Sequence, residues 1–272
     1  MGGMSGPAPE PVQLSVIMPV FNEARTLPRI LLAVAQALPG VRKEIILVDD
    51  ASTDGTREWI RANVPQGGRA ASALRLDAQG NLVDGDGAAH AGVVIRACFH
   101  ATNMGKGAGL RTGLAAAQGE VLVIQDGDLE YDPADWATMY ELIARRRTAD
   151  IVFGSRFLGP AGHFPYRRQY LANMLLSRLF SLLYRQKLTD VEVCYKMFSR
   201  AVARGLRITR NDFGCEIQMA AQMLRPRCWR FQEVGVGYRG RTYGEGKGIG
   251  WRDGLKAVWY LLWYRVAAAG RP

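Results

Sequence analysis

Short apolar runs alternate with amphipathic stretches through the first 160 residues of the chain. The runs are rich in Val and Ile, and each is bounded by polar residues, Gly or Pro, which is the pattern of a buried strand. This pattern predicts strands at 14–20, 44–50, 93–100, 120–128 and 149–157.

The stretch between the first two predicted strands indicates a helix, because its apolar residues recur at helical spacing. These residues are Leu27, Ile30, Leu31, Val34 and Leu38. A strand, a helix and a second strand in this order form a βαβ unit, which requires a parallel sheet. A Gly-rich turn at 103–109 leads into a further helix, whereas the Gly- and Asp-rich span 65–91 predicts a surface excursion, with a hairpin as one form of it.

Carboxylates cluster at the end of the fourth predicted strand and directly beyond it. The sequence VLVIQDGDLEYDP, which begins at Val121, places Asp126, Asp128, Glu130 and Asp132 within seven positions. If the backbone stays extended, Asp126 and Asp128 point the same way, and two such oxygen ligands suit Mg²⁺ or Mn²⁺ shared with a substrate diphosphate. An isolated Asp-x-Asp also fits a solvated turn, and Asp132, which precedes a proline, is predicted to cap the next helix.

The ends of the first two predicted strands carry further groups that a parallel sheet would bring to the same edge. Glu23 and Asp50 can accept hydrogen bonds from a nucleobase or ribose, and Pro19 and Phe21 can form an apolar wall. The Gly-rich turn adds closely approaching backbone and Lys106, although it lacks the residue order of a P-loop. We therefore expect a nucleotide-binding cleft at this edge of the sheet.

The charge balance narrows the class of partner. The chain has 35 Lys and Arg against 25 Asp and Glu, a net charge of +10, which fits nucleic acid, nucleotide phosphates or an acidic membrane face. No helix-turn-helix, zinc-finger or RNA-recognition signature occurs, so we expect no nucleic-acid partner. The four cysteines lack C-x-x-C spacing, which argues against a disulfide framework or zinc site and favours a reduced, cytoplasmic setting.

The first residues of the chain and the part after residue 160 depart from the α/β pattern. Residues 1–12 are rich in Gly and Pro and predict a disordered tail, while 163–187 and 251–272 predict amphipathic helices with basic residues. The first of these helices carries leucines at helical spacing: Leu171, Leu175, Leu179 and Leu182. The apolar faces fit either packing on the core or peripheral contact with a membrane, and no run reaches the roughly 18 apolar residues of a membrane span.

Several motifs resemble those of the family 2 glycosyltransferases, which have the GT-A (Rossmann-like) fold. They are PVFNEA, VDDASTDGT, NMGKGAGLRTGLAAAQG, QDGDLEYDP and GSR, in consistent order. Two later segments, TDVEVCYKMFSR and YRGRTYGEGKGIGWRDG, resemble the branch that contains dolichyl-phosphate mannose synthases and bacterial polyprenyl-phosphate glycosyltransferases. The resemblance spans about Leu14 to Gly254.

The resemblance implies roles for individual residues. Those expected to hold the nucleoside of a nucleotide-sugar are Pro19, Phe21, Glu23 and Asp50. The expected metal ligands are Asp126 and Asp128, with Glu130 as a third, and Asp128 is also expected to be catalytic. Those expected to neutralise the donor diphosphate and the acceptor phosphate are Arg156, which is also expected to be catalytic, and the loop residues Arg239, Arg241 and Lys247. Asp190 is expected to act as a base or as an organiser of the acceptor site, with a helix cap or loop acid as its alternative.

The resemblance, with the residues that carry it, implies an inverting, metal-dependent glycosyltransferase that moves a sugar from a nucleotide donor to a polyprenyl phosphate at the cytoplasmic face of a membrane. A GT-A domain is expected over 13–250, followed by a C-terminal amphipathic helix. The alternatives are the same chemistry on a soluble acceptor, a catalytically silent nucleotide- or lipid-binding module and, as a weaker rival, a nucleotidyltransferase. The sugar, the nucleotide and the oligomeric state stay open.

Overall fold

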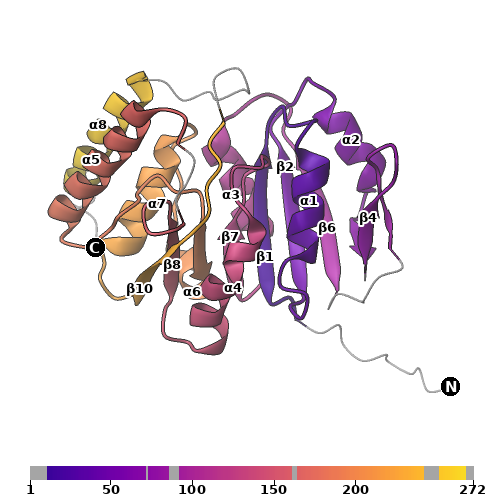
Figure 1. Cartoon of the computed structure of the whole chain (residues 1–272), viewed down its shortest axis with the longest axis horizontal. Helices are drawn as coiled ribbons and strands as arrows, with labels where there is room; N and C mark the ends of the chain where they lie inside the picture. The colour runs from indigo at the N-terminus through magenta and orange to yellow at the C-terminus, as the bar shows by residue number, and fades with distance from the viewer. Residues whose placement is uncertain (1–10, 72, 86–91, 161–163, 242–250, 268–272) are drawn as a thin grey trace.

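A central eight-stranded sheet crosses the molecule, with helices on both of its faces (Figure 1). The computed structural model describes residues 11–71, 73–85, 92–160, 164–241 and 251–267. The strands of this sheet are β1 (Leu14–Val20), β2 (Lys43–Asp49), β3 (Arg69–Ala71), β6 (Val93–Phe99), β7 (Val121–Ile124), β8 (Ile151–Ser155), β9 (Lys196–Ser199) and β10 (Phe231–Gly235). They are arranged in the order β10-β8-β9-β7-β1-β2-β6-β3.

Most neighbouring strands of the sheet are parallel. Strand β1 pairs in parallel with β2 and β7, β2 with β6, and β8 with β10. Strand β9 is antiparallel to both β7 and β8, and the edge strand β3 is antiparallel to β6. The predicted fold class, a mostly parallel central sheet flanked by helices, is therefore confirmed.

Ten helical segments connect or flank these strands in the described parts of the chain. They are α1 (Leu27–Gln36), α2 (Thr56–Asn63), α3 (Lys106–Ala116), η1 (Pro133–Asp135), α4 (Trp136–Tyr140), η2 (Glu141–Arg145), α5 (Arg167–Tyr184), α6 (Arg200–Gly205), α7 (Gly214–Leu224) and α8 (Trp251–Ala267). Helix α1 buries Leu27, Ile30, Leu31 and Val34 of the predicted stripe, but it ends at Gln36, so the fifth predicted member, Leu38, lies beyond it. Asp132 caps η1 through a hydrogen bond from the Ala134 backbone N–H to its carboxylate, as its position before a proline predicts.

The Gly- and Asp-rich excursion contains a small hairpin of its own. Strands β4 (Leu74–Leu76) and β5 (Leu82–Asp84) pair antiparallel, and Asp77 closes their turn by accepting hydrogen bonds from the Gln79 and Asn81 N–H groups. The hairpin form of the predicted excursion is therefore present in the described part of this span.

Helix α3 begins earlier and β7 ends earlier than the sequence pattern predicts. Lys106 is the first residue of α3, so most of the predicted turn is helical, because glycines there pack closely: a Cβ on Gly109 would lie 2.9 Å from Pro19 Cβ. Strand β7 stops at Ile124, where its pairing with β1 ends, and Asp126 and Asp128 lie in the loop beyond it. The two aspartates are thus held by a loop, not by an extended strand.

Helices α5 and α8 lie side by side at one end of the molecule (Figure 1). Both helices expose apolar side chains. The Tyr184 hydroxyl donates to the Leu261 carbonyl (3.1 Å), which ties the two helices together. The outward-facing apolar residues are Leu171, Leu175 and Leu182 of α5, and Trp259, Leu262, Trp263 and Val266 of α8. Core packing is therefore the wrong interpretation for three of the four predicted stripe leucines; only Leu179 packs against the core.

The close packing of α3 on β1 gives a testable prediction. A Cβ on Gly113 would meet the Ile17 side chain, which is fully buried in β1, whereas a Cβ on Gly205 would meet nothing within 4 Å. Gly113→Ala is expected to lower the free energy of unfolding by about 1–3 kcal/mol relative to Gly205→Ala. Urea unfolding monitored by circular dichroism would measure both, and equal midpoints would contradict the close packing.

Candidate active site

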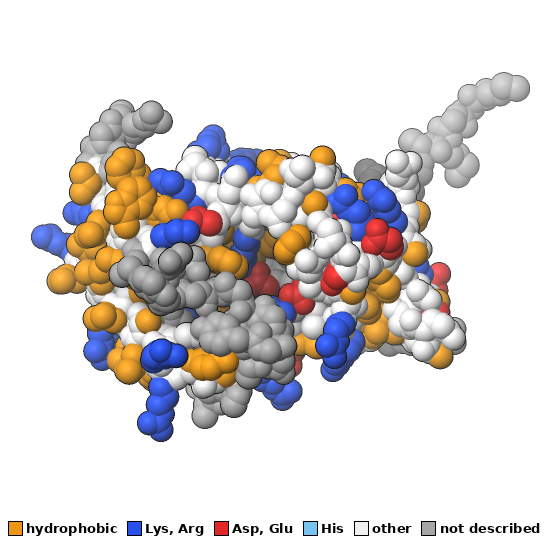
Figure 2. Space-filling view, turned by 90° about the horizontal axis from the view of Figure 1, so that it is seen from above, with side chains coloured by type: hydrophobic (Ala, Val, Ile, Leu, Met, Phe, Trp, Pro, Cys, Tyr) orange, Lys and Arg blue, Asp and Glu red, His pale blue; other side chains and the backbone are white. Residues whose placement is uncertain are grey.

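A cavity opens beyond the C-terminal end of β7 and extends to helices α5, α7 and α8. Figure 2 shows acidic side chains in a hollow near the middle of this face of the molecule. Six of the predicted site residues line the cavity: Lys106, Asp126, Asp128, Glu130, Arg156 and Arg241. The structure thus brings together groups that lie up to 135 positions apart in the sequence, 106 to 241.

A chain of ion pairs holds Asp126. Lys106, at the start of α3, contacts Asp126 at 2.7 Å and Glu216 of α7 at 2.9 Å, and Glu216 in turn pairs with Lys196 of β9. Burial tends to raise the pKa of Asp126, but the Lys106 charge and the hydrogen bonds from Lys106 and Cys194 together outweigh it, and the pKa is lowered. Asp126 is therefore an ionised group whose charge is balanced from within the chain.

Arg241 lies among the other carboxylates of the cluster. Its Nη2 contacts Asp128 Oδ2 at 2.6 Å, its Nη1 contacts Glu23 Oε1 at 2.9 Å, and its backbone N–H donates to Glu130 Oε1 at 2.9 Å. Burial and the neighbouring charge of Asp126 raise the pKa of Asp128 to about 7, and Arg241 acts against this rise. One guanidinium thus balances carboxylates from two separate strand ends.

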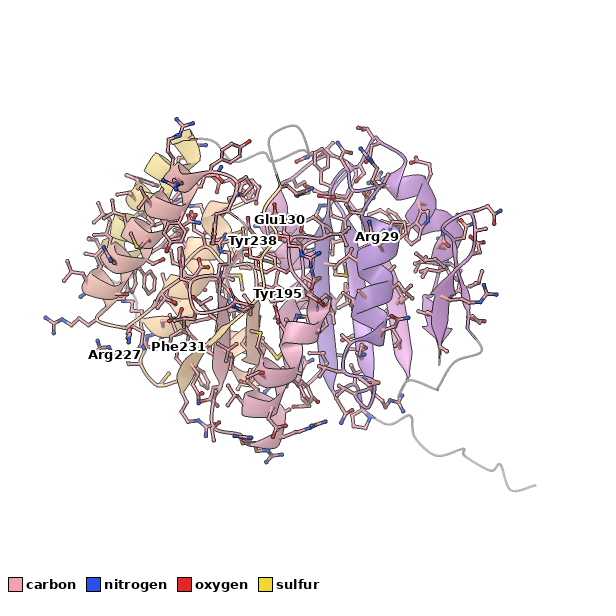
Figure 3. The ribbon with its side chains drawn as sticks, in the orientation of Figure 1. Arg29, Glu130, Tyr195, Arg227, Phe231 and Tyr238 are labelled. Carbon is pink, nitrogen blue, oxygen red and sulfur yellow. The ribbon has the colours of Figure 1, made fainter. Side chains whose placement is uncertain are left out.

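Glu130 holds the segment that carries Arg241. The Tyr238 hydroxyl donates to Glu130 Oε2 (3.0 Å), and the Arg239 backbone N–H donates to the Glu130 carbonyl (2.9 Å). Figure 3 shows Glu130 and Tyr238 together above Tyr195 in the middle of the molecule. Both carboxylate oxygens of Glu130 are therefore engaged by the segment that follows β10.

The donor chemistry of the cluster suits a divalent cation, but its present arrangement does not form a metal site. Carboxylate oxygens are the ligands that Mg²⁺ and Mn²⁺ prefer. Among the residues that the structure describes, however, no group of three His, Cys, Asp or Glu side chains is placed to hold a metal ion. Asp126 and Asp128 face Lys106 and Arg241 instead, so the predicted ligand set stays a prediction.

Arg156 and Asp190 form a buried bidentate pair beside the cavity. Arg156 Nε and Nη2 each contact an Asp190 carboxylate oxygen at 2.6 Å, and the Arg156 backbone N–H donates to the same group at 3.1 Å. The Tyr238 ring lies over the Arg156 guanidinium, 5.1 Å from it. Asp190 is fully buried and does not line the cavity, so its geometry is that of an organiser that orients Arg156.

The residues predicted for the nucleoside lie outside the cavity lining. Asp50 accepts hydrogen bonds from the Met104 and Gly105 N–H groups (2.9 and 2.6 Å) and pairs with His100 at 2.6 Å, so it fastens the turn before α3. Phe21 is exposed at the end of β1. Their nucleoside roles, and that of Pro19, stay predictions.

Two predicted phosphate-binding residues do not enter the cavity lining. Arg239 is exposed, and it is its backbone that contacts Glu130. Lys247 lies outside the described residues.

Glu192 and Asn173 line the cavity but were not predicted. With its amide nitrogen facing Glu192, Asn173 donates to that carboxylate, and its oxygen accepts from Arg156 Nη2 at 3.1 Å. Burial raises the pKa of Glu192 from 4.5 to about 7, although Arg156 acts in the opposite direction. Glu192 follows Asp190 by two positions, and Asn173 is a polar residue within the leucine-rich helix; these were the available sequence signals.

Comparison with known proteins identifies the family of this chain. A model of glycosyl transferase family 2 matches residues 15–72 and 87–207, more than half of the chain. The chain therefore belongs to glycosyl transferase family 2, and the resemblance seen in the sequence motifs is confirmed.

The curated relatives include enzymes named for polyprenyl phosphates. The chain is 27% identical over 259 residues to the undecaprenyl-phosphate mannosyltransferase of Micrococcus luteus, covering 93% of this chain and 94% of that protein. It is 29% identical over 205 residues to the dodecaprenyl-phosphate galacturonate synthase of Rhizobium johnstonii, which covers 73% of this chain. The matched part spans 52% of the Rhizobium protein, about half of its length.

Solved structures show the same fold. The glucosyl-3-phosphoglycerate synthase of Mycobacterium tuberculosis, in complex with Mn²⁺ and UDP-glucose, matches with a TM-score of 0.64 and 17% sequence identity. The match covers 94% of this chain and 79% of that one. At this identity the likeness supports the GT-A fold and carries no residue role.

The raised pKa of Glu192 gives a prediction on stability. The carboxyl has its ordinary pKa of 4.5 in the unfolded chain and about 7 when folded, so the unfolded state loses the proton first as pH rises. Glu192 therefore costs stability increasingly between these two values and fully above them. Glu192→Gln is expected to raise the free energy of unfolding by about 1–3 kcal/mol near pH 8, and by less near pH 5.

Chemical unfolding at the two pH values would measure this difference. Glu120→Gln removes the same charge from an exposed position after α3 and serves as the matched control. A gain that is equal at both pH values, or a loss at the higher one, would contradict the assignment of a costly buried carboxylate.

Proposed function

We propose that this family 2 protein is an inverting glycosyltransferase that moves a sugar from a nucleotide-sugar to a polyprenyl phosphate at a membrane surface, with a divalent cation. The observation that carries the proposal is the likeness to the undecaprenyl-phosphate mannosyltransferase of Micrococcus luteus over 93% of this chain. The cavity supports the proposal independently. Carboxylates suited to a divalent cation, and Lys and Arg side chains suited to phosphates, line the same cavity.

The chemistry of the cavity fits the departure of a nucleoside diphosphate. Breaking the bond between the sugar C1 and the diphosphate oxygen leaves negative charge on the departing group, which fixed cations stabilise. Lys106, Arg156 and Arg241 are the cavity cations that we assign to this charge. A divalent cation held by Asp126 and Asp128 would supply further charge stabilisation.

The acceptor step requires little proton transfer. A phosphate monoester is largely ionised at neutral pH, so its oxygen can attack the sugar C1 from the face opposite the diphosphate and invert its configuration. No base is then needed, which agrees with the full burial of Asp190 in its pair with Arg156. We propose that Asp190 positions Arg156.

The exposed apolar surface of α5 and α8 supports contact with a bilayer. Leu175 and Leu182 are 68% and 75% exposed, and Trp263 is 47% exposed. Figure 2 shows apolar and basic side chains together at the end of the molecule where these helices lie. Exposed basic residues flank the leucines: Arg167, Arg168, Arg178, Arg185 and Lys187. The occupant that this surface fits is an anionic lipid headgroup layer, with the apolar side chains below it.

Contact at the bilayer surface would not require a membrane span. Of the helices described in the structure, none is long and apolar enough to cross a bilayer. Gln169 and Asn173 of α5, and Lys256 and Tyr260 of α8, line the cavity. Both helices therefore contribute to the exposed surface and to the cavity, which would place a lipid phosphate within reach of the site.

The proposed reaction gives a prediction on catalysis. With Mn²⁺, a panel of GDP- and UDP-sugars and undecaprenyl phosphate in detergent, the chain is expected to release nucleoside diphosphate and to form a lipid-linked sugar. Asp128→Asn is expected to lower the rate by about 100-fold or more, because it removes a proposed ligand of the divalent cation that would stabilise the negative charge on the departing diphosphate. Glu120→Gln is the control and is expected to match the wild type.

Release that needs no lipid, or that responds to a soluble phosphorylated acceptor, would favour the soluble-acceptor alternative. If no donor yields nucleotide and Asp128→Asn behaves like the wild type, the catalytic proposal fails and a silent binding module is favoured.

The exposed surface gives a prediction on membrane binding. The protein is expected to sediment in part with vesicles that contain phosphatidylglycerol at low salt, and to remain in the supernatant with neutral vesicles or at high salt. Replacing Leu175 and Trp263 together by Ser is expected to weaken partitioning by about tenfold or more, because each buried side chain of this size is worth about 1.5–3 kcal/mol.

Phe99→Ser is the matched control, because Phe99 is an exposed apolar residue on β6, towards the opposite end of the sheet. Recovery of all wild-type protein in the supernatant with anionic vesicles, or equal weakening by Phe99→Ser, would count against membrane contact through α5 and α8.

A further inference from the structure

Arg241 occupies the position among the carboxylates where a divalent cation is expected. Its guanidinium contacts Asp128 at 2.6 Å and Glu23 at 2.9 Å, and its Nε lies 3.5 Å from Glu130. That Nε is buried and makes no hydrogen bond within the described residues. The guanidinium of Arg241 therefore neutralises the acids, while its Nε–H donor has no hydrogen-bond acceptor among the described residues.

The charges of the cluster leave room for a further cation. Within the described residues, four carboxylates, Glu23, Asp126, Asp128 and Glu130, contact two cations, Lys106 and Arg241, and Lys106 is shared with Glu216. The acids of the cluster thus outnumber the cations that contact them, an excess that a divalent ion would offset. Such an ion would also compete with Arg241 for Asp128, because both bind the same carboxylate.

The backbone around Arg241 is fixed separately from its guanidinium. Glu130 accepts from the Arg241 N–H and the Tyr238 hydroxyl through its carboxylate, and from the Arg239 N–H through its carbonyl. Figure 3 shows the Glu130 and Tyr238 side chains lying close together. The guanidinium can thus leave Asp128 by side-chain rotation while these backbone contacts stay in place, and a donor diphosphate in the cavity would be an anion able to receive it.

We propose that Arg241 is an exchangeable counter-ion that couples metal binding to donor binding: it keeps a divalent cation weakly bound until a nucleoside diphosphate arrives and accepts the displaced guanidinium. This inference rests on the proposed function and specifies how the same site is regulated. Metal and nucleotide then bind with positive coupling, and the coupling is reciprocal, since each ligand must raise the affinity of the other by the same factor.

Titration of free Mn²⁺ by electron paramagnetic resonance, with and without saturating GDP or UDP, tests the inference without measuring turnover. In the wild type, the nucleotide is expected to tighten Mn²⁺ binding by about 10- to 100-fold. Arg241→Gln removes the competing charge, so Mn²⁺ alone is expected to bind about tenfold tighter, and the nucleotide is expected to add about threefold or less.

Arg204→Gln is the matched control, because it removes the same charge from an exposed side chain of α6, outside the cavity lining. It is expected to leave both the Mn²⁺ affinity and the coupling close to those of the wild type. Arg241→Lys keeps the charge and is expected to retain weak binding of Mn²⁺ alone, which separates competition from a general effect on folding.

Independent binding of Mn²⁺ and nucleotide in the wild type would overturn the inference, whatever the variants do. So would an unchanged or weakened affinity of Arg241→Gln for Mn²⁺ alone. If the wild type transfers sugar and binds nucleotide but shows no coupling through Arg241, only the inference fails. If neither GDP nor UDP binds with Mn²⁺ present and no donor is consumed, the proposed function fails as well.

Discussion

The constraint on which the site depends is the mutual repulsion of carboxylates gathered beyond the ends of two parallel strands. Like charges held so close raise one another's pKa and destabilise the fold unless cations offset them. The chain supplies those cations itself: Lys106 from α3 faces Asp126, and Arg241 from the segment after β10 faces Asp128. The ion pairs hold α3, the loop after β7 and the segment after β10 around one cavity.

The positions of the strands, and the sheet edge at which the acids gather, can be predicted from the sequence because both follow from local patterns. Strand β1 runs from Leu14 to Val20 as expected, and the acids after β7 lie at the predicted edge. The start of α3 could not be foreseen in this way, since glycines usually mark turns, and the close contacts that require glycine there, such as that of Gly109 with Pro19, arise only in the folded chain.

Contacts between distant residues are the part that sequence patterns miss. Arg241 was expected to meet phosphates, but its pairing with Glu23, 218 positions away, depends on how the sheet closes. Asp190 was recognised as an acid of interest, but its full burial against Arg156 appears only in three dimensions. Glu192 was overlooked because a single acid in a motif gives no indication of its burial.

Helix α5 contributes side chains both to the active-site cavity and to the exposed apolar surface. Asn173 turns inward and bridges Arg156 and Glu192, while Leu171 and Leu175, two positions before and after it, turn outward. Any force that reorients this helix at a lipid surface would act directly on the hydrogen bonds of Arg156. The side of the cavity that α5 lines is thus more directly exposed to the surroundings of the protein than the sheet is.

The position of Arg241 also affects which part of the chain contains all the charges of the carboxylate cluster. The part that matches the family model ends at residue 207, whereas the arginine that balances Asp128 lies at 241. A fragment cut to the matched region would keep every acid of the cluster and lose one of its two cations. The shared core of the family and the electrostatically complete core of this protein therefore have different boundaries.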